Sequence, residues 1–596
     1  MIKRKIVFVL IVLFVTANAY SQAINPWVAS DKKYKDGTAT PNLFSMEKFH
    51  QSPHFKDLGP KEFCLKFFDI FYDGRRKNWG DFKKGLSHWS HTGQEPRATE
   101  KSIEYDPIIL FNVFGNGYCG IQSGMMEGVF QSRPGGTPGK PLLEARRWNL
   151  AGGFHSVCDV FYEGKWHYFD IDLGGYAGDT KKGIWSIPDV MNDPDGYHGS
   201  KTSIKSPYFF KADANGAWVS SSLKGKKAYS FKDNHMVGHE MTFTLRKGET
   251  FTRYFSQAKK GASFYTPFTK KVTKNAKGYS ELVYTPNDFK NDAISIDGDE
   301  VITVVRSPYN IVSSKVEASG KVFYSIDLGL SWHSLPADGL VKDVVNRWDY
   351  LLKVKGGKLN KVTTISMLYP GSLPRVGKSA TQMSIEKMAD YQSLTWYADF
   401  SSAEAIAKWG TIEKLKYKSK ELSGSFTKGQ LSGNGSLTIP VTAPKGTKLV
   451  KLSVCVKGGQ STSARPNEFI ELYIGKEGAS KLIDKSVDCS SWGANGKYKV
   501  EHGAVNVNGS LAFEPADKME IKVKVTGWGY LKGMRVFVFF KPIKASSVDG
   551  ELIVTHGYDG KTFSKTIKCK DIGSTPITYS TPDGAKENDF IKMEVK

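Results

Sequence analysis

The chain has 596 residues, with 83 Lys and Arg against 60 Asp and Glu and a formal net charge of +23. Its 40% hydrophobic and 24% charged residues are ordinary for globular proteins, which excludes disorder as the dominant state, and its length allows several hydrophobic cores. The 59 Gly and 25 Pro indicate many turns and a large β content.

Residues 1–22 have the features of a secretory signal peptide. Lys3, Arg4 and Lys5 form a basic region, and the apolar run 6–17 is too short to span a membrane comfortably. We expect a secreted or periplasmic protein with no integral membrane segment in the mature chain, which keeps a charge of +20 once those three basic residues are removed. Such a field attracts polyanions, and outside the cytoplasm we expect anionic glycans rather than nucleic acid.

Residues 23–104 are predicted to form helices and loops. The clearest helix covers 60–72, where Pro60 stands in the first turn and Phe63, Phe67 and Phe71 recur at helical spacing. Residues 105–204 then combine a Gly-flanked cysteine, a helical stretch and two strands, which predicts an α+β core.

Alternating strands dominate from residue 205 onward, for example at 241–245, 301–305 and 322–326. We predict a β-rich extension of the core at 205–290, a β-sandwich module at 291–395, and a C-terminal β-sandwich region of jelly-roll or carbohydrate-binding-like type at 396–596. Within the module, 325–332 resembles an Asp-box hairpin, in which Asp and Ser side chains bind the turn backbone.

The six cysteines are too few for a disulfide framework in so long a chain, although Cys455 and Cys489 lie in one β-rich segment and can pair. No clustered Cys and His spacing typical of zinc is present. His235 and His239 have ligand-like spacing but no third ligand beside them, so we expect no metal.

Cys119 is predicted to begin a helix, because Ile121, Met125 and Val129 recur every four residues after it. At a helix N-terminus the macrodipole and the unpaired N–H groups stabilise a thiolate. The alternative is a small buried hydrophobic residue, which is what most free cysteines are.

Residues 155–172 predict a β-hairpin around a Glu163-Gly164 turn. With that turn, Val157 lies opposite Asp170 and His155 opposite Asp172, and all four share one face. Asp170 is then the diagonal neighbour of His155 and Asp172 its direct partner. Either carboxylate can orient the imidazole and support its charged form.

Gly117-Tyr118-Cys119, the helix after it, the Arg146-Arg147-Trp-Asn-Leu strand, and His155 followed by Trp166 and Phe169-Asp170 together resemble the transglutaminase-like superfamily. The resemblance covers residues 108–176. It implies a papain-like core in which Cys119 is the nucleophile, His155 its base and Asp170 the orienting carboxylate, with Asp172 as the alternative. The fold class is therefore α+β: a transglutaminase-like core with an N-terminal helical segment, followed by β-sandwich modules.

The resemblance implies acyl transfer or amide hydrolysis through a thioester, without a cofactor or a metal. An oxyanion donor besides the Cys119 amide is expected upstream, and Trp89, Trp79 and Asn116 are candidates. The long Pro/Gly loop at 132–141 departs from the family pattern and leaves the substrate open between a peptide or amide and a glycan.

A second hypothesis is a lyase on the same fold that cleaves an acidic or sulfated polysaccharide. Arg146 or Arg147 would neutralise the substrate carboxylate, His155 would take a proton, and Tyr118 or Tyr168 would protonate the leaving oxygen. A third hypothesis is a glycan-binding protein whose triad has no activity.

Overall fold

The structure is a computed structural model of the whole chain. It describes residues 28–30, 41–72, 106–114, 119–134, 142–150, 155–171, 176, 178–179, 183–192, 229–230, 237–241, 245–254, 278–287, 289–290, 293–345, 347–368, 381–385, 391–398, 400, 402–422, 426–459, 469–486, 504–527, 529–542, 550–569, 577–580 and 588–596. The predicted signal peptide lies outside these residues. Within them, we find no helix that is both long and apolar enough to cross a bilayer.

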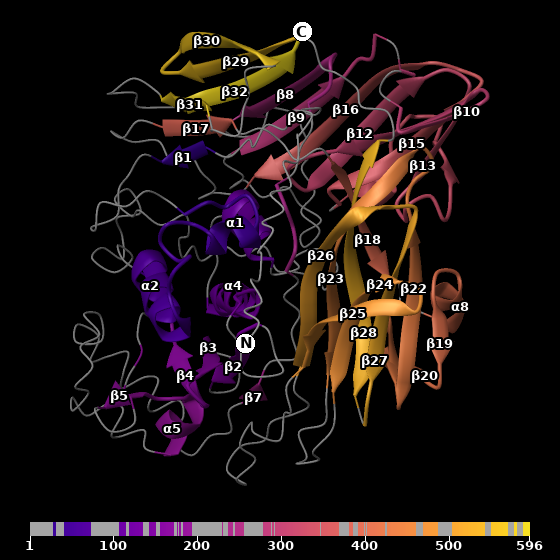
Figure 1. The fold of residues 1–596 in the computed structure, drawn as a ribbon. Helices are drawn as coiled ribbons and strands as arrows, with labels where there is room; N and C mark the ends of the chain where they lie inside the picture. The colour runs from indigo at the N-terminus through magenta and orange to yellow at the C-terminus, as the bar shows by residue number, and fades with distance from the viewer. Residues whose placement is uncertain are drawn as a thin grey trace, which may run out of the picture.

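The N-terminal half of the described chain contains most of its helices (Figure 1). They are α1 (Met46–His50), α2 (Pro60–Tyr72), α3 (Pro107–Ile109), the π-turn η1 (Leu110–Phe114), α4 (Cys119–Gln131) and α5 (Ile187–Asn192). The helix expected at 60–72 is confirmed at both ends. Its phenylalanines are buried with Phe130 of α4, so α2 and α4 share one core.

The core sheet has the strand order β4-β3-β2-β7. Its strands are β2 (Glu144–Leu150), β3 (His155–Tyr162), β4 (Lys165–Phe169) and β7 (Tyr229–Ser230), and a separate pair is formed by β5 (Gly178–Asp179) and β6 (Gly183–Ile184). Cys158 and Val160 pack with Met125 and Val129 of α4. Helix α4 therefore covers one face of the core sheet, as expected for an α+β unit.

A middle sandwich follows, made of two packed sheets. The large sheet has the order β12-β16-β9-β8-β32-β29-β30, and the small sheet has the order β10-β11-β15-β13-β14. The large sheet contains β8 (Glu249–Tyr254), β9 (Gly278–Tyr284), β12 (Ile311–Ala318), β16 (Leu359–Leu368), β29 (Glu551–Tyr558), β30 (Lys561–Lys568) and β32 (Asn588–Val595). The small sheet contains β10 (Ser295–Asp297), β11 (Glu300–Arg306), β13 (Lys321–Ser325), β14 (His333–Ser334) and β15 (Asp349–Lys355), with the short turn η3 (Lys342–Val344) nearby.

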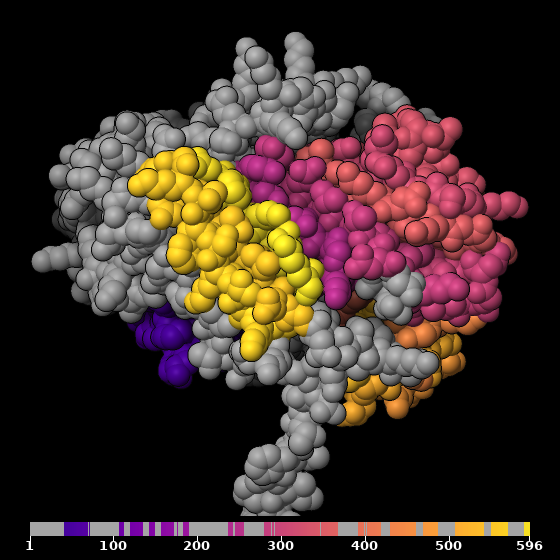
Figure 2. Space-filling model, turned by 90° about the horizontal axis from the view of Figure 1, so that it is seen from above, coloured from indigo at the N-terminus to yellow at the C-terminus, as the bar shows by residue number. Residues whose placement is uncertain are grey.

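The large sheet corrects two predicted boundaries. Strand β32 pairs with β8 on one side and β29 on the other, so β29, β30 and β32 belong to the middle sandwich and not to the C-terminal region (Figure 2). Strands β8 and β9 belong to the same sheet, so they do not extend the core sheet. The strand expected at 241–245 is also not seen: Met241 and Leu245 lie outside strands, and 242–244 lie outside the described residues.

The predicted Asp-box hairpin is confirmed between β13 and β14. Ser325 donates to Asp327 at 2.8 Å, and the Ser331 amide donates to Asp327 at 2.9 Å. Leu328 and Gly329 have positive φ angles of 62° and 88°, which the tight turn requires. The hairpin is a local turn structure, and the Asp327 carboxylate stabilises the backbone of that turn.

The C-terminal sandwich spans residues 392–542. Its inner sheet has the order β20-β21-β28-β23-β26 with β18 also on β28, and its outer sheet has the order β19-β22-β27-β24-β25. The inner sheet contains β18 (Gln392–Ala398), β20 (Lys416–Leu422), β21 (Phe426–Ser432), β23 (Thr447–Gly459), β26 (Ala504–Ala516) and β28 (Tyr530–Pro542). The outer sheet contains β19 (Thr411–Glu413), β22 (Gly435–Thr442), β24 (Ile470–Lys476), β25 (Ala479–Lys485) and β27 (Lys518–Val525), with α8 (Ala403–Ala407) at its edge.

A small sheet joins distant parts of the chain, because β17 (Thr381–Ile385) lies between β1 (Val28–Ser30) and β31 (Ile577–Ser580). The inner sheet of the C-terminal sandwich packs against the core. Lys451 on β23 binds Glu240 at 2.5 Å, and a Cβ added to Gly238 would clash with the Ser453 hydroxyl. Arg306 on β11 of the middle sandwich also donates to the Glu240 carbonyl at 3.2 Å, so both sandwiches contact the segment 237–241.

Candidate functional site

Helix α4 begins at Cys119, as the sequence predicts. Ile121, Met125 and Val129 are all buried and fix the helix on the core sheet. The backbone of Cys119 therefore has the helix N-terminal position that favours a thiolate. The Cys119 side chain lies outside the described part of the structure.

The hairpin of β3 and β4 has the predicted register. Cys158 pairs with Phe169 and Asp159 with Tyr168, and the turn residues Glu163 and Gly164 have φ angles of 50° and 78°. Two positive φ angles are typical of a type I′ turn, which matches the twist of the strands. Continued by one pair, this register sets Val157 opposite Asp170, as expected.

The N-terminal turn of α4 lies over the first residues of β3. A Cβ built on Gly120 would be 4.0 Å from the Ser156 hydroxyl, and the Arg147 side chain donates to the Gly120 carbonyl at 2.7 Å. Since Cys119 precedes Gly120 and His155 precedes Ser156, the start of α4 and the start of β3 lie at the same end of the core sheet. The His155 side chain, like that of Cys119, is not among those described.

Asp170 is buried, and it accepts a hydrogen bond from the Tyr168 hydroxyl at 3.3 Å. Tyr168 packs with Val157 and Trp148 on the face of the sheet opposite α4. Asp170 therefore lies on the face of the core sheet opposite α4.

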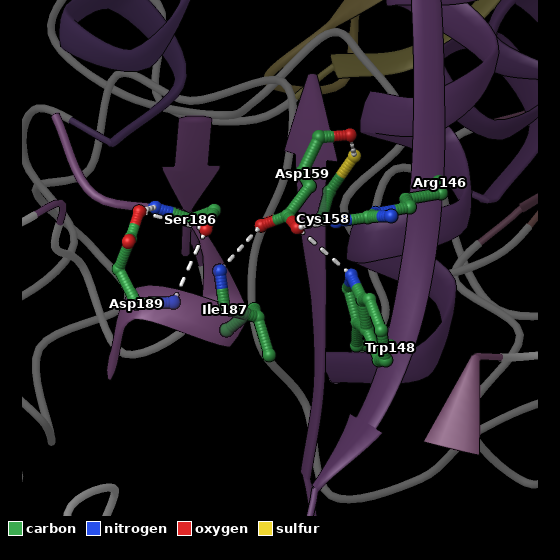
Figure 3. A network of polar contacts seen from close by, with 7 residues as sticks. All are labelled: Arg146, Trp148, Cys158, Asp159, Ser186, Ile187 and Asp189. Atoms are coloured by element: carbon green, nitrogen blue, oxygen red, sulfur yellow. Dashed lines mark hydrogen bonds and ion pairs between the residues drawn. The ribbon is translucent and has the colours of Figure 1, made fainter. Parts of the chain in front are cut away.

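A buried ion pair that the sequence analysis did not single out lies on the same face (Figure 3). Asp159 accepts hydrogen bonds from Arg146 at 2.9 Å, from the Trp148 indole at 3.0 Å and from the Ile187 amide at 3.2 Å. These contacts tie β2, β3 and the start of α5 together. The only signal in the sequence was the parity of Asp159, which places it on the face shared by Val157.

Helix α5 is anchored beside this ion pair by a reciprocal cap. The Ser186 hydroxyl donates to Asp189 at 2.8 Å, and the Asp189 amide donates to the Ser186 hydroxyl at 3.2 Å. Figure 3 shows this cap on one side of Asp159 and Trp148 on the other. The β3–β4 hairpin is thus supported by β2, which precedes it in sequence, and by α5, which follows it.

The arginines named for the lyase hypothesis are engaged within the protein. Arg146 is buried against Asp159, with its guanidinium 3.8 Å from the Trp166 ring centre, and Arg147 is buried against Gly120. Tyr168 is likewise buried, and its hydroxyl donates to Asp170. These contacts favour structural roles for Arg146, Arg147, Trp166 and Tyr168 over direct contact with a substrate.

Other predicted residues lie outside the described residues: Trp79, Trp89, Asn116, Tyr118, Asp172, His235 and Cys489. Cys64, Cys158, Cys455 and Cys569 are all buried. Burial raises the pKa of the Cys158 thiol, which suits a structural residue. The suggested pairing of Cys455 with Cys489 stays a prediction, because Cys489 lies outside the described residues.

His239 is buried against the rings of Trp348 and Phe537, at centroid distances of 4.5 and 5.6 Å. Burial, and then Arg306 nearby, lower its pKa well below the usual value. Among the residues that the structure describes, no group of three or more His, Cys, Asp or Glu side chains is arranged to hold a metal ion.

Comparison with known proteins gives no family model and no curated relative that matches the chain. Among solved structures, similarity is found to a xylan-binding CBM22-1 domain from Paenibacillus barcinonensis (11% identity, 25% of this chain and 94% of that chain, TM-score 0.16). Similarity is also found to a C-terminal CBM6 of LamC from Zobellia galactanivorans, with 8% identity over 24% of this chain and 98% of that chain and a TM-score of 0.15. A third match is latent PorU from Porphyromonas gingivalis, with 11% identity over 51% of this chain and 33% of that chain and a TM-score of 0.18. At these scores the similarities assign neither a fold nor a function.

Proposed function

We propose that the chain is a thiol enzyme of transglutaminase-like type, with Cys119 as nucleophile, His155 as base and Asp170 as orienting carboxylate. The observation that supports this is the approach of Gly120 to Ser156, which brings the residues before them to one end of the core sheet. The confirmed register of β3 and β4 adds the diagonal position of Asp170. These positions support a Cys-His-Asp relay in which His155 reaches Cys119 around the start of β3.

The reaction is acyl transfer. The Cys119 thiolate attacks an amide or ester carbonyl, a carbon–sulfur bond forms, and His155 gives its proton to the leaving amine or alcohol. Water or a second amine then attacks the thioester while His155 takes up its proton, and the thiolate is released. Arg147 donates a hydrogen bond to the Gly120 carbonyl at the start of α4, and this contact fixes the position of the helix end that carries Cys119.

A polysaccharide lyase is the second candidate, favoured by the charge of +23, which suits an anionic glycan. In that reaction His155 would take the C5 proton of an acidic sugar, and Tyr118 would protonate the leaving oxygen. Because Arg146 and Arg147 are engaged within the protein, another residue would have to neutralise the sugar carboxylate. Under either candidate we propose that the protein contacts anionic glycans. A glycan-binding protein without activity is the third candidate.

The test is the pH dependence of iodoacetamide labelling at Cys119, measured by peptide mass spectrometry. A thiolate–imidazolium pair predicts fast labelling well below the usual thiol pKa of about 8.5, and slower labelling in a His155→Ala variant. Cys158, a buried thiol in the adjacent hairpin, is the internal control and should label slowly. Equal rates at the two cysteines would reject the thiol mechanism.

Substrate assays separate the candidates. If the protein is a thiol enzyme, a Cys119→Ser variant should lose hydrolysis of amide and peptide substrates. If it is a lyase, the same variant should retain elimination. Elimination is read from new absorbance of unsaturated uronate on alginate, an ulvan-like glycan and a glycosaminoglycan. A protein that labels normally at Cys119 but shows neither activity on any of these substrates would belong to the binding class.

A further inference from the structure

The hydroxyl of Ser156, at the start of β3, faces the first turn of helix α4. Side chains alternate along a strand, and Cys158 and Val160 of β3 pack with the buried residues of α4. Ser156 therefore lies on the same face of the core sheet, next to the helix end. A Cβ built on Gly120 would be 4.0 Å from the Ser156 hydroxyl oxygen, so the hydroxyl is close to the helix backbone without pressing on it.

This hydroxyl is buried and unpaired. Ser156 is 6% exposed, and no hydrogen bond joins its side chain to any residue that the structure describes. The serine hydroxyls of α4 and of the residue after it are both used, because Ser123 donates to the Gly120 carbonyl at 3.2 Å and Ser132 to the Val129 carbonyl at 2.8 Å. Leaving a buried hydroxyl without a partner costs roughly 1–3 kcal/mol, so such a group in a folded protein calls for a functional explanation.

The first turn of α4 adds backbone donors beside this hydroxyl. The first four amides of a helix have no partner within it, and the aligned peptide dipoles favour negative charge at that end. In α4 these amides begin at Cys119. The Arg147 guanidinium donates to the Gly120 carbonyl at 2.7 Å and so fixes the turn against β2. A small anionic oxygen placed here would have amides on the helix side and the Ser156 hydroxyl on the sheet side.

The proposed acyl transfer creates such an oxygen. When the Cys119 thiolate attacks a carbonyl carbon, a carbon–sulfur bond forms and the π electrons of the C=O bond move to the oxygen. That oxyanion is stabilised by donors that are already in place, and the loss of one donor typically slows a reaction by about 10²–10³-fold. The Cys119 amide is one donor. The candidates expected upstream for the second, Trp79, Trp89 and Asn116, lie outside the described residues.

We propose that the Ser156 hydroxyl is an oxyanion donor of the candidate site and acts together with the Cys119 amide. The inference rests on the proposed thiol mechanism and adds one catalytic residue to it. No proton is transferred in this contact. The hydroxyl donates a hydrogen bond to the oxyanion as the carbon–sulfur bond forms, and this bond weakens when the C=O bond re-forms and the leaving group departs.

The experiment compares two reactions of Cys119 in the full mature protein. p-Nitrophenyl acetate acylates the thiol through a tetrahedral oxyanion and releases p-nitrophenolate, whereas iodoacetamide alkylates it by displacement and forms no oxyanion. The rate that remains in a Cys119→Ser variant is subtracted as background. Ser156→Ala should slow acylation by about tenfold or more, while the rate and the pH profile of iodoacetamide labelling stay within about twofold of the wild type.

The matched control is Ser123→Ala, which removes a hydroxyl of the same helix that is already bonded to the Gly120 carbonyl. This variant should leave both rates within about twofold. Thermal unfolding is measured for all variants. Ser156→Ala should not lower the melting temperature, because it removes no hydrogen bond among the described residues and relieves an unpaired buried hydroxyl.

The outcomes separate this inference from the thiol mechanism itself. Fast labelling of Cys119 in the wild type, with equal acylation rates in the wild type and in Ser156→Ala, would overturn the role of Ser156 and leave the nucleophile in place. Equal losses of acylation and labelling in Ser156→Ala would also overturn it, because the hydroxyl would then act on the thiolate or on the position of the helix. Slow labelling of the wild type without release of p-nitrophenolate would overturn both proposals.

Discussion

Asp106 and Arg535 form an ion pair in which both side chains are 0% exposed, with the Arg535 guanidinium 2.7 Å from the Asp106 carboxylate. Asp106 caps α3 by accepting the Ile108 amide at 3.0 Å, and it also accepts the His239 amide at 2.9 Å. The carboxylate thus joins the segment that leads into α4 to the inner sheet of the C-terminal sandwich. Both the docking of the C-terminal sandwich and the position of the candidate site therefore depend on the Asp106 carboxylate.

The variant Arg535→Met should destabilise the protein by about 3–5 kcal/mol, because it leaves Asp106 charged and buried without its partner. Urea unfolding measures the loss. The control is Lys445→Met, which breaks the exposed Lys445–Asp297 pair and should cost less than about 1 kcal/mol. Equal, small losses would show that the sandwich docks through apolar contacts alone.

Asp159→Asn should destabilise the core by about 3 kcal/mol or more. The amide keeps the shape of the carboxylate but leaves the buried Arg146 charge uncompensated and replaces one acceptor by a donor beside Trp148. The readout is thermal unfolding monitored by near-ultraviolet circular dichroism. A change below about 1 kcal/mol would contradict the role given to this pair.

For the Glu163-Gly164 turn we predict smaller changes in stability. Gly164 has a φ of 78° and nothing within 4 Å of an added Cβ, so Gly164→Ala should cost about 1 kcal/mol from backbone strain without a steric clash. Glu163→Asn at a φ of 50° should stabilise the turn by a few tenths of a kcal/mol, since Asn tolerates this conformation better. Opposite signs in chemical denaturation would refute the turn assignment.

The buried histidines favour unfolding as the pH drops below about 6.5, whereas burial raises the pKa of Asp106 to about 7 and opposes this trend. Burial lowers the pKa of His239 well below its usual value, that of His50 to about 3 and that of His167 to about 4. Between those values and about 6.5 the unfolded chain binds protons that the folded chain does not, so acid favours unfolding. His239→Gln should flatten the pH dependence of the melting temperature between pH 7 and 5. His333→Gln, at an exposed position, should not.

Under the thiol mechanism, Tyr168→Phe should slow Cys119 labelling and turnover by roughly tenfold, because Asp170 loses the hydroxyl that holds it. The effect should appear in kcat and in the pH profile rather than in KM, as expected of a positioning residue. The control is Tyr162→Phe on the face towards α4, which should leave both rates within about twofold.

Local structure was predictable where the sequence pattern and the packing agree. Pro60 and the phenylalanine spacing fixed α2, and the Glu163-Gly164 turn set the register of β3 and β4. Both depend on residues that are neighbours in sequence. Periodicity also gave the start of α4 at Cys119, because the buried residues of that helix follow it at regular intervals.

Long-range pairing was not predictable in this way. The strand 588–595 has an ordinary alternating pattern, and nothing local indicates that it pairs with 249–254 as well as with 551–558. Buried ion pairs could not be predicted from the sequence either. Arg535 and Arg306 are charged residues, and only tertiary contacts bury them. For the candidate site, the sequence predicted Cys119, His155 and Asp170 as a set, but the Asp159 contacts required coordinates, because they join β2, β3 and α5.

The place of β32 in the large sheet has a consequence for the order of events during synthesis. Strand β8 leaves the ribosome more than 300 residues before β32, and until then one of its edges has no native partner. The middle sandwich therefore closes only after the C-terminal sandwich has been translated, and its late contacts are among the most distant in sequence, which predicts slow folding. A nascent chain in this interval exposes an unpaired strand edge, so its solubility depends on chaperones or on rapid translocation.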